Sequence, residues 1–286
     1  MRRLLAALAA WLVAGSAAAL TLTDDAGRTV TLAAPAQRVA TLAPFLAELA
    51  FSAGVGARVV AASEHSDFPD AARALPRVSS AAGIAIESLA ATRPDLVLAW
   101  QDAITPADVE RLRVLRIPVF IAQARSLADV PRLLEAIGAL AGVPVGGIAA
   151  GYRERIEKLR AAHRGVEPIP VLLEIWHQPL TTLAGRHWIN EALAVCGARN
   201  AFDDLPGIAP GVPWELVIAR APRVIVGAGS ARDAAAFAAQ WADRSVLAAV
   251  RERRLVFVPG DLLQRPTLRL ADGVTRLCDG LDRLRD

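Results

Sequence analysis

The chain has 286 residues, 54% of them hydrophobic, and a formal net charge of +3, and this length suffices for two domains of ordinary size. Without Arg2 and Arg3 the charge falls from +3 to +1, and no basic run with interleaved aromatics occurs, so nucleic-acid binding is not supported. The sequence also lacks a G-x-S-x-G turn, a phosphate-cradling glycine loop, an H-E-x-x-H helix and paired metal-site cysteines, a lack that favours a binding protein without excluding an enzyme.

Residues 1–19 have the pattern of a signal peptide. Two arginines precede an apolar stretch at 4–15, and small residues follow at 16–19. The apolar stretch is too short for a membrane-spanning helix, and no cysteine follows it that could carry a lipid. We therefore expect an exported protein cleaved near Ala19, with an uncleaved anchor as the alternative.

Strand and helix patterns alternate through the first half of the mature chain. Residues 20–37 are expected to be mobile. The predicted strands are 38–42, 58–62, 95–100 and 117–122, and the predicted helices are 44–53, 107–115 and 126–140. Such alternation predicts a parallel sheet with helices on both faces.

A long predicted helix at 145–163, with arginines and glutamates spaced as on a solvated helix, divides the chain. Beyond it the alternation resumes, with strands at 171–176, 223–226 and 255–258 and helices at 188–195 and 268–284. We predict an α/β fold of two lobes, each a mainly parallel sheet flanked by helices, joined by one long α-helix. The predicted divisions are a first lobe at 20–143, the connecting helix at 144–165 and a second lobe at 166–286.

Two segments 128 residues apart are near copies of each other. Each has a glycine (Gly83, Gly211), a glutamate four residues later (Glu87, Glu215), a short apolar helix, a proline and a β-branched run. A repeat of this long period indicates two lobes of related design and not a solenoid. It also puts one glutamate at an equivalent point in each lobe.

The cleft between two such lobes, at the carboxyl ends of the strands, is where ligands bind in these folds. The residues that follow the predicted strands and turns there are His65, Ala81, Trp100, Trp176, His177, the turn at 209–211, Asp261 and Arg265. Aromatic faces, neutral hydrogen-bonding groups and one charge pair suit a large, flat, partly polar ligand. Asp261 and Arg265, four residues apart, could equally form a structural ion pair on one helical turn.

Cys196 and Cys278 are the only cysteines. In an oxidising compartment an isolated pair is more often a disulfide than a metal site, and two free thiols are the alternative. A bond between them would tie the helix at 188–195 to the C-terminal helix. Closing a loop of about 80 residues would stabilise the fold by roughly 4 kcal/mol in the chain-entropy model.

Several strings resemble the class of periplasmic binding proteins that serve importers of cobalamin, siderophores and haem, and within it the cobalamin-binding members. These strings lie at 66–69, 94–100, 195–202, 213–215 and 261–278. The resemblance implies a periplasmic binding protein that captures cobalamin or a related corrinoid between its lobes and catalyses no reaction. It implies delivery to an inner-membrane ABC permease dimer, a monomer when free, and no cofactor besides the ligand.

Residue by residue, the resemblance places Trp100 against the corrin ring, with Asp261 and Arg265 as the polar pair of the second lobe. Glu87 and Glu215 correspond to the surface glutamates that enter arginine pockets on the permease. Cys196 and Cys278 correspond to the family disulfide. The stiff connecting helix implies only a small closure of the lobes.

The chain also departs from the family pattern around the ligand. His65 stands where the family has a tyrosine, and Ala81 and Ala209 stand where it has tryptophans. Thr181 and Thr182 lie where another aromatic is expected. The pocket should therefore be wider, unless Trp176, Trp188 or Trp214 refills it; each of these could equally belong to the core.

These departures leave alternatives open. Haem or a ferric siderophore could be the ligand, with His65 or His177 as an axial haem ligand, because the only tyrosine, Tyr152, lies on the connecting helix. His65 would meet a metal only through the ligand. A second alternative is an exported hydrolase. His187 is expected at the surface.

Overall fold

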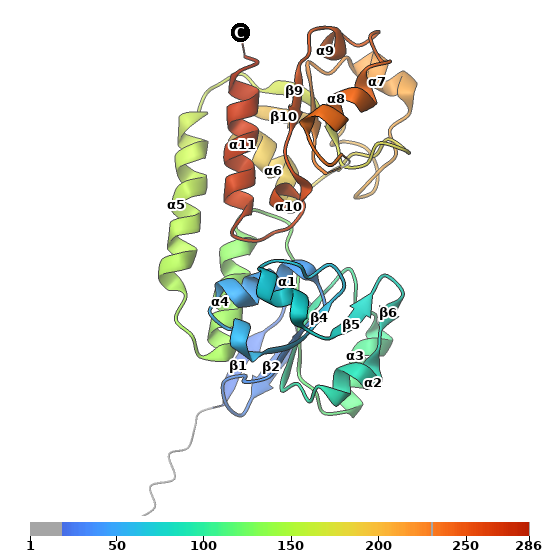
Figure 1. Cartoon of the computed structure of the whole chain (residues 1–286). Coiled ribbons are helices and arrows are strands. Elements are labelled where there is room, and N and C mark those ends of the chain that lie inside the picture. Colours follow the sequence, from blue (N-terminus) through green and yellow to red (C-terminus); the bar gives the residue numbers. More distant parts are fainter. Residues whose placement is uncertain (1–18, 230, 286) are drawn as a thin grey trace, which may run out of the picture.

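The computed structural model describes residues 19–229 and 231–285. The predicted signal peptide therefore lies almost wholly outside the described residues. Two sheet-containing lobes stand one above the other, and a long helix runs along one side of both (Figure 1). This arrangement confirms the predicted fold class.

The first lobe holds one mixed sheet, a separate hairpin and the helices that cover them. Its elements are β1 (Leu20–Thr23), β2 (Thr29–Leu32), β3 (Val39–Thr41), α1 (Pro44–Ser52), η1 (Gly56–Arg58), β4 (Val59–Ser63), η2 (Asp70–Ala74), β5 (Arg77–Ser80), β6 (Gly83–Ile84), α2 (Ile86–Ala91), β7 (Leu96–Trp100), α3 (Pro106–Val114), β8 (Val119–Ala122) and α4 (Asp129–Ala141). The strand order in its sheet is β6-β5-β4-β3-β7-β8, with only the β5–β6 pair antiparallel.

The second lobe follows the connecting helix α5 (Gly146–Ala162). Its elements are β9 (Ile169–Glu174), α6 (Trp188–Val195), β10 (Ala198–Asn200), α7 (Trp214–Arg220), β11 (Val224–Gly227), α8 (Ala234–Trp241), α9 (Ala248–Arg251), β12 (Leu255–Phe257), α10 (Gly260–Leu263) and α11 (Leu270–Asp282). Its four strands are all parallel, in the order β10-β9-β11-β12.

Four strands of the first sheet repeat the topology of the second. The parallel series β4-β3-β7-β8 of the first lobe corresponds strand for strand to β10-β9-β11-β12 of the second. β7 begins at residue 96 and β11 at residue 224, which reproduces the 128-residue spacing of the sequence repeat. Both strands are buried apolar runs, as expected for central parallel strands. The repeat in the sequence thus reflects a repeated fold.

The helix α5 packs on α4 in the first lobe and on α6 and α11 in the second. It was predicted at 145–163 and is found one residue shorter at each end.

The lobes also contact each other directly. Arg269, before α11, donates two hydrogen bonds of 2.7 Å to Glu48 of α1, and Glu48 is 1% exposed. The helix α5 is therefore not the only connection between the two lobes. The predicted boundaries of the lobes stay predictions.

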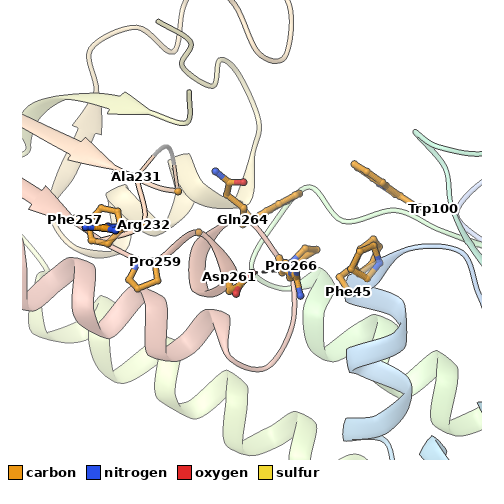
Figure 2. A pocket seen from close by; sticks show the side chains of 14 residues that line it. Phe45, Trp100, Ala231, Arg232, Phe257, Pro259, Asp261, Gln264 and Pro266 are labelled. Carbon is orange, nitrogen blue, oxygen red and sulfur yellow. Dashed lines mark ion pairs between the residues drawn. The ribbon is translucent and has the colours of Figure 1, made fainter. Parts of the chain in front are cut away.

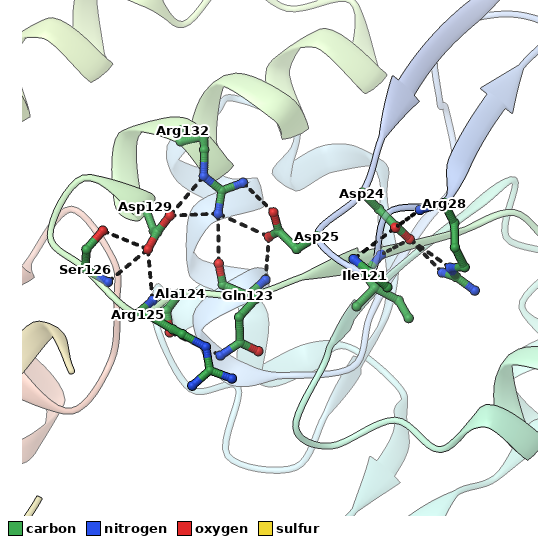
Figure 3. A network of polar contacts seen from close by, with 11 residues as sticks. Asp24, Asp25, Arg28, Ile121, Gln123, Ala124, Arg125, Ser126, Asp129 and Arg132 are labelled. Carbon is green, nitrogen blue, oxygen red and sulfur yellow. Dashed lines mark hydrogen bonds and ion pairs between the residues drawn. The ribbon is translucent and has the colours of Figure 1, made fainter. Parts of the chain in front are cut away.

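The expectation that residues 20–37 are mobile is wrong. β1 and β2 form an antiparallel hairpin whose Leu-Thr and Thr-Val alternation points apolar side chains inward. At its base, the carboxylate of Asp24 accepts hydrogen bonds from Arg28 and from the backbone N–H of Ile121 in β8. Asp25 accepts two further hydrogen bonds from Arg132 of α4 (Figure 3). The hairpin is thus fixed to the first lobe.

Cys196, at the end of α6, and Cys278, within α11, form a disulfide. This confirms the predicted pairing and the two helices that it joins. Both cysteines belong to one apolar cluster that runs through the two lobes, from Val39 and Leu98 in the first to Val226 and Leu277 in the second.

Candidate functional site

A cavity lies between the lobes. This main pocket measures about 510 Å³ and is drawn in Figure 2. Its lining comes from the start of α1, the end of β7, the start of α6, the loop after β11 and the segment from β12 to α11: Pro44, Phe45, Trp100, Trp188, Gly229, Ala231, Arg232, Phe257, Pro259, Gly260, Asp261, Gln264, Arg265 and Pro266. The strands β7 and β12 reach the pocket with their last residues and β11 ends two residues before it, so the lining lies at carboxyl ends of strands, where parallel sheets hold ligands.

Trp100 is the central residue of the cleft. As the last residue of β7 it is half-buried, and its ring meets that of Phe45 edge to face, with centroids 6.0 Å apart. It lines the main pocket and two smaller pockets beside it. Trp188 faces it from the second lobe and is held by an N–H donated to the carbonyl of Leu263 at 2.8 Å. The sequence left open whether Trp188 belongs to the pocket or to the core. Its side chain is 7% exposed, and it both packs in the apolar core and lines the pocket.

Arg265 joins the lobes at the edge of the main pocket. Its guanidinium lies 3.3 Å from Asp261, as the sequence spacing suggested, and 2.8 Å from Asp67 of the first lobe. It also donates to the carbonyl of His65. Burial opposes ionisation of Asp67, but the hydrogen bond and charge of Arg265 outweigh it, so the pKa of Asp67 lies below its usual value. Asp67 follows the predicted strand at 58–62, yet sequence reasoning missed it.

His65 and Ala81 line a second cavity, the first-lobe pocket, of about 230 Å³. It lies between the ends of β4 and β5 and opens beside Trp100. His65 is exposed and has a left-handed backbone (φ 60°), which turns the chain sharply after β4. Ala81 is exposed on the opposite wall, so no large side chain fills the pocket there.

A third cavity, the side pocket, measures about 350 Å³ and shares Trp100, Trp188 and Gln264 with the main pocket. Asp102, Gln123 and Arg125 line it from the first lobe, and Arg186 and His187 line it from the second. None of these residues was predicted from the sequence to line a pocket. Gln123 and Arg125 follow the predicted strand at 117–122, so extending the strand-exit rule to that strand would have found them.

His187 is half-buried and is not the freely exposed residue that was expected. It caps α6 by accepting the backbone N–H of Ile189 at Nδ1, and its ring stacks on Trp188 with centroids 3.8 Å apart. Burial, and secondarily the charge of Arg125, lowers its pKa from 6.5 to about 4. The ring is therefore neutral at neutral pH, with its proton on Nε2.

Trp176 and His177 lie apart from the three pockets. Trp176 is 58% exposed, and its indole N–H donates to the carbonyl of Gln178. His177 packs edge to face on Trp241, and its Nδ1 lies 3.3 Å from the buried carboxylate of Glu174. Their contact with the ligand stays a prediction, and the site described above does not depend on it.

Glu87 and Glu215 occupy matching places. Each is the second residue of a short helix, α2 or α7, and each is exposed. In Figure 1 the two helices lie in different lobes, both on the side of the molecule away from α5. Each lobe thus carries one exposed glutamate near the start of a short helix on that side of the molecule.

In the part of the chain that the structure describes, no group of three or more His, Cys, Asp or Glu side chains could hold a metal ion. Among the same residues, no helix is both long and apolar enough to cross a membrane. Metal contact by His65 stays a prediction that concerns a metal carried by the ligand.

The pattern of a family described as periplasmic binding protein matches residues 39–262. A vitamin B12-binding protein of Vibrio parahaemolyticus is 30% identical over 253 residues, which are 88% of this chain and 91% of that protein. One from Vibrio cholerae is 33% identical over 247 residues, 85% of this chain and 88% of that protein.

Solved structures agree with these sequence matches. The periplasmic vitamin B12 binding protein BtuF of Vibrio cholerae superposes with a TM-score of 0.80 at 33% identity, covering 88% of this chain and 99% of that one. The periplasmic heme-binding protein BhuT, solved with two hemes, superposes with a TM-score of 0.73 at 26% identity, covering 88% and 99%.

Proposed function

The chain belongs to the periplasmic binding protein family, and from this premise we propose that it captures cobalamin or a related corrinoid in the cleft between its lobes. The family makes it a binding protein of the periplasm and not an enzyme, which removes the hydrolase alternative. Cleavage of the export signal near Ala19 remains part of the proposal. The main support for a corrinoid ligand is the aromatic cleft centred on Trp100, in a chain 30–33% identical to vitamin B12-binding proteins.

In the proposed complex the corrin ring lies against Trp100, with Trp188 on the second-lobe side. Both rings line the main pocket, and both are held by neighbours, so little side-chain freedom is lost on binding. Asp261 and Arg265 offer hydrogen bonds to the amide groups at the rim of the corrin. Arg265 keeps its bridge to Asp67, so ligand and bridge share one guanidinium.

The absence of large side chains at Ala81 and Ala209 is compatible with this ligand. Ala81 leaves the first-lobe pocket open beside the main one, and Ala209 is exposed. Trp188 supplies ring area from the opposite lobe. The ligand would thus be held mainly between two tryptophans, with room beside Ala81 for the groups on the corrin rim.

We also propose that the loaded protein docks on an inner-membrane ABC permease dimer through Glu87 and Glu215. Equivalent carboxylates on two lobes suit a partner with two-fold symmetry, because one basic pocket per permease subunit then meets one glutamate. The free protein is proposed to be a monomer.

Haem is the second candidate ligand. His65 is exposed in the first-lobe pocket beside Trp100, where its imidazole could bind the iron of a planar ligand. The likeness to a heme-binding protein at 26% identity favours the same alternative.

Spectroscopic titration separates the candidates. Purified mature protein is titrated with cyanocobalamin and, separately, with haemin. We expect saturable binding of the corrinoid, and we expect Trp100→Ala to weaken it by about tenfold or more, since a buried aromatic contact is lost. Val114→Ala is the control, because it removes an exposed apolar side chain of α3 outside the three pockets. A Soret shift that is lost in His65→Ala, without corrinoid binding, would support haem instead.

A further inference from the structure

The side pocket carries positive charge that the fold does not neutralise. Arg125, whose side chain is 48% exposed, lies 3.8 Å from Asp102, the carboxylate that faces it. Arg186 is exposed and makes no ion pair with any residue in the described ranges 19–229 and 231–285. Two guanidiniums and one carboxylate therefore line the same cavity and leave one excess positive charge.

The turn that presents Arg125 is held rigidly. The carboxylate of Asp129 accepts the backbone N–H groups of Arg125 and Ser126, both at 2.9 Å, and Arg132 pairs with Asp129. Asp25 accepts the backbone N–H of Gln123. Figure 3 shows this network, with the side chain of Arg125 turned away from the Asp129–Arg132 pair. The backbone is thus fixed before any ligand arrives, which lowers the entropic cost of using the guanidinium.

The second lobe adds a neutral donor. Because Nδ1 of His187 accepts the N–H of Ile189, its ring proton is on Nε2, on a ring that lines the side pocket. Two guanidiniums with a neutral N–H donor match a singly charged oxyanion, since guanidinium groups pair with phosphate oxygens through directed, charge-assisted hydrogen bonds.

We propose that the side pocket binds the phosphodiester of a complete corrinoid, the group that links the ring to its nucleotide base. This inference rests on the proposed function and narrows its ligand to corrinoids that carry a nucleotide loop. Trp100, Trp188 and Gln264 belong to both pockets, so one ligand can occupy the two together. Arg125 and Arg186 thereby act as residues that select complete corrinoids over precursors.

The test compares two probes on three proteins. Cyanocobalamin carries the phosphodiester and dicyanocobinamide lacks it. The proteins are wild type, the double variant Arg125→Gln/Arg186→Gln, and the control Arg111→Gln, which removes a 65% exposed arginine paired with Asp108 on α3. We expect the double variant to bind cyanocobalamin about tenfold or more weakly and dicyanocobinamide less than about twofold more weakly. Raising the salt concentration should reduce the difference in affinity for cyanocobalamin between wild type and the double variant.

Equal losses for the two probes, or no loss for either, would overturn the inference while leaving corrinoid capture intact. If wild type binds neither probe, the proposed function fails, and the phosphodiester site fails with it. Thermal melting of each protein checks that the variant is folded. Should the double variant melt early, the single variant Arg186→Gln replaces it, because Arg186 is exposed and supports no described ion pair.

Discussion

Individual side chains at the cleft show which contacts residue spacing can predict and which it cannot. Asp261 and Arg265 pair across one turn, as their separation of four suggests. The shorter contact of Arg265, 2.8 Å to Asp67, joins residues 198 positions apart and depends on how the lobes face each other. Periodicity within one element carries no information about such a contact, so sequence reasoning found one partner and missed the other.

The shifted pKa of His187 makes the stability of the fold depend on pH. Its folded pKa of about 4 lies below the ordinary 6.5, so the unfolded chain takes up a proton first as the pH falls. Stability present at neutral pH is therefore lost between about pH 6.5 and 4. Between about pH 7.5 and pH 5 this residue should account for a loss of about 2 kcal/mol in the free energy of unfolding.

Urea unfolding of wild type and His187→Asn at the two pH values measures this contribution. Asparagine keeps a side-chain acceptor for the N–H of Ile189 but does not titrate. The variant should lose about 2 kcal/mol less than wild type on acidification. Identical pH dependence in both proteins would show that His187 is not buried as described.

At the scale of elements, apolar runs and breakers predicted most strands and helices. Such a run, bounded by proline or glycine, identifies a buried parallel strand like β7 or β11 wherever it occurs. The hairpin β1–β2 was missed because its four-residue strands are short and its anchors, Asp24 and Asp25, act on distant α4 and β8. Helix α8 was also missed, since its alanine-rich sequence has little periodic contrast.

The disulfide between α6 and α11 yields a second prediction. It spans 82 residues, and opening it releases that loop in the unfolded state. Replacing both cysteines by alanine should lower the free energy of unfolding by about 4 kcal/mol, measured by urea unfolding under non-reducing conditions. A loss below about 1 kcal/mol would mean that packing of α11 on α5 and α6 holds these helices without it.

For the whole molecule, the repeat in the sequence correctly predicted two lobes of related design, since four strands of each sheet share one topology. It did not predict how tightly they are joined. The bidentate contact of Arg269 with Glu48 takes the carboxylate almost wholly out of solvent, whereas the Arg269 side chain remains 22% exposed. A continuous apolar cluster also crosses between the lobes. These links agree with the small closure expected from the connecting helix.

The pseudo-symmetric placement of Glu87 and Glu215 gives a prediction about transport. The variant Glu87→Ala/Glu215→Ala should bind ligand as wild type does, while uptake through the reconstituted permease falls about tenfold or more, because both docking charges are gone. Glu110→Ala/Glu252→Ala is the control, since these are exposed glutamates at other places on the two lobes. Uptake unchanged by the first pair would reject the docking role.

We propose that the corrinoid lies between the lobes with its ring against Trp100. Anomalous diffraction at the cobalt edge, from crystals grown with cyanocobalamin, tests it directly because cobalt marks the ring centre. We predict one strong peak in the main pocket, between Trp100 of the first lobe and Trp188 of the second. A peak outside the cleft, or none in crystals soaked to saturation, would show that the corrinoid does not bind between the lobes.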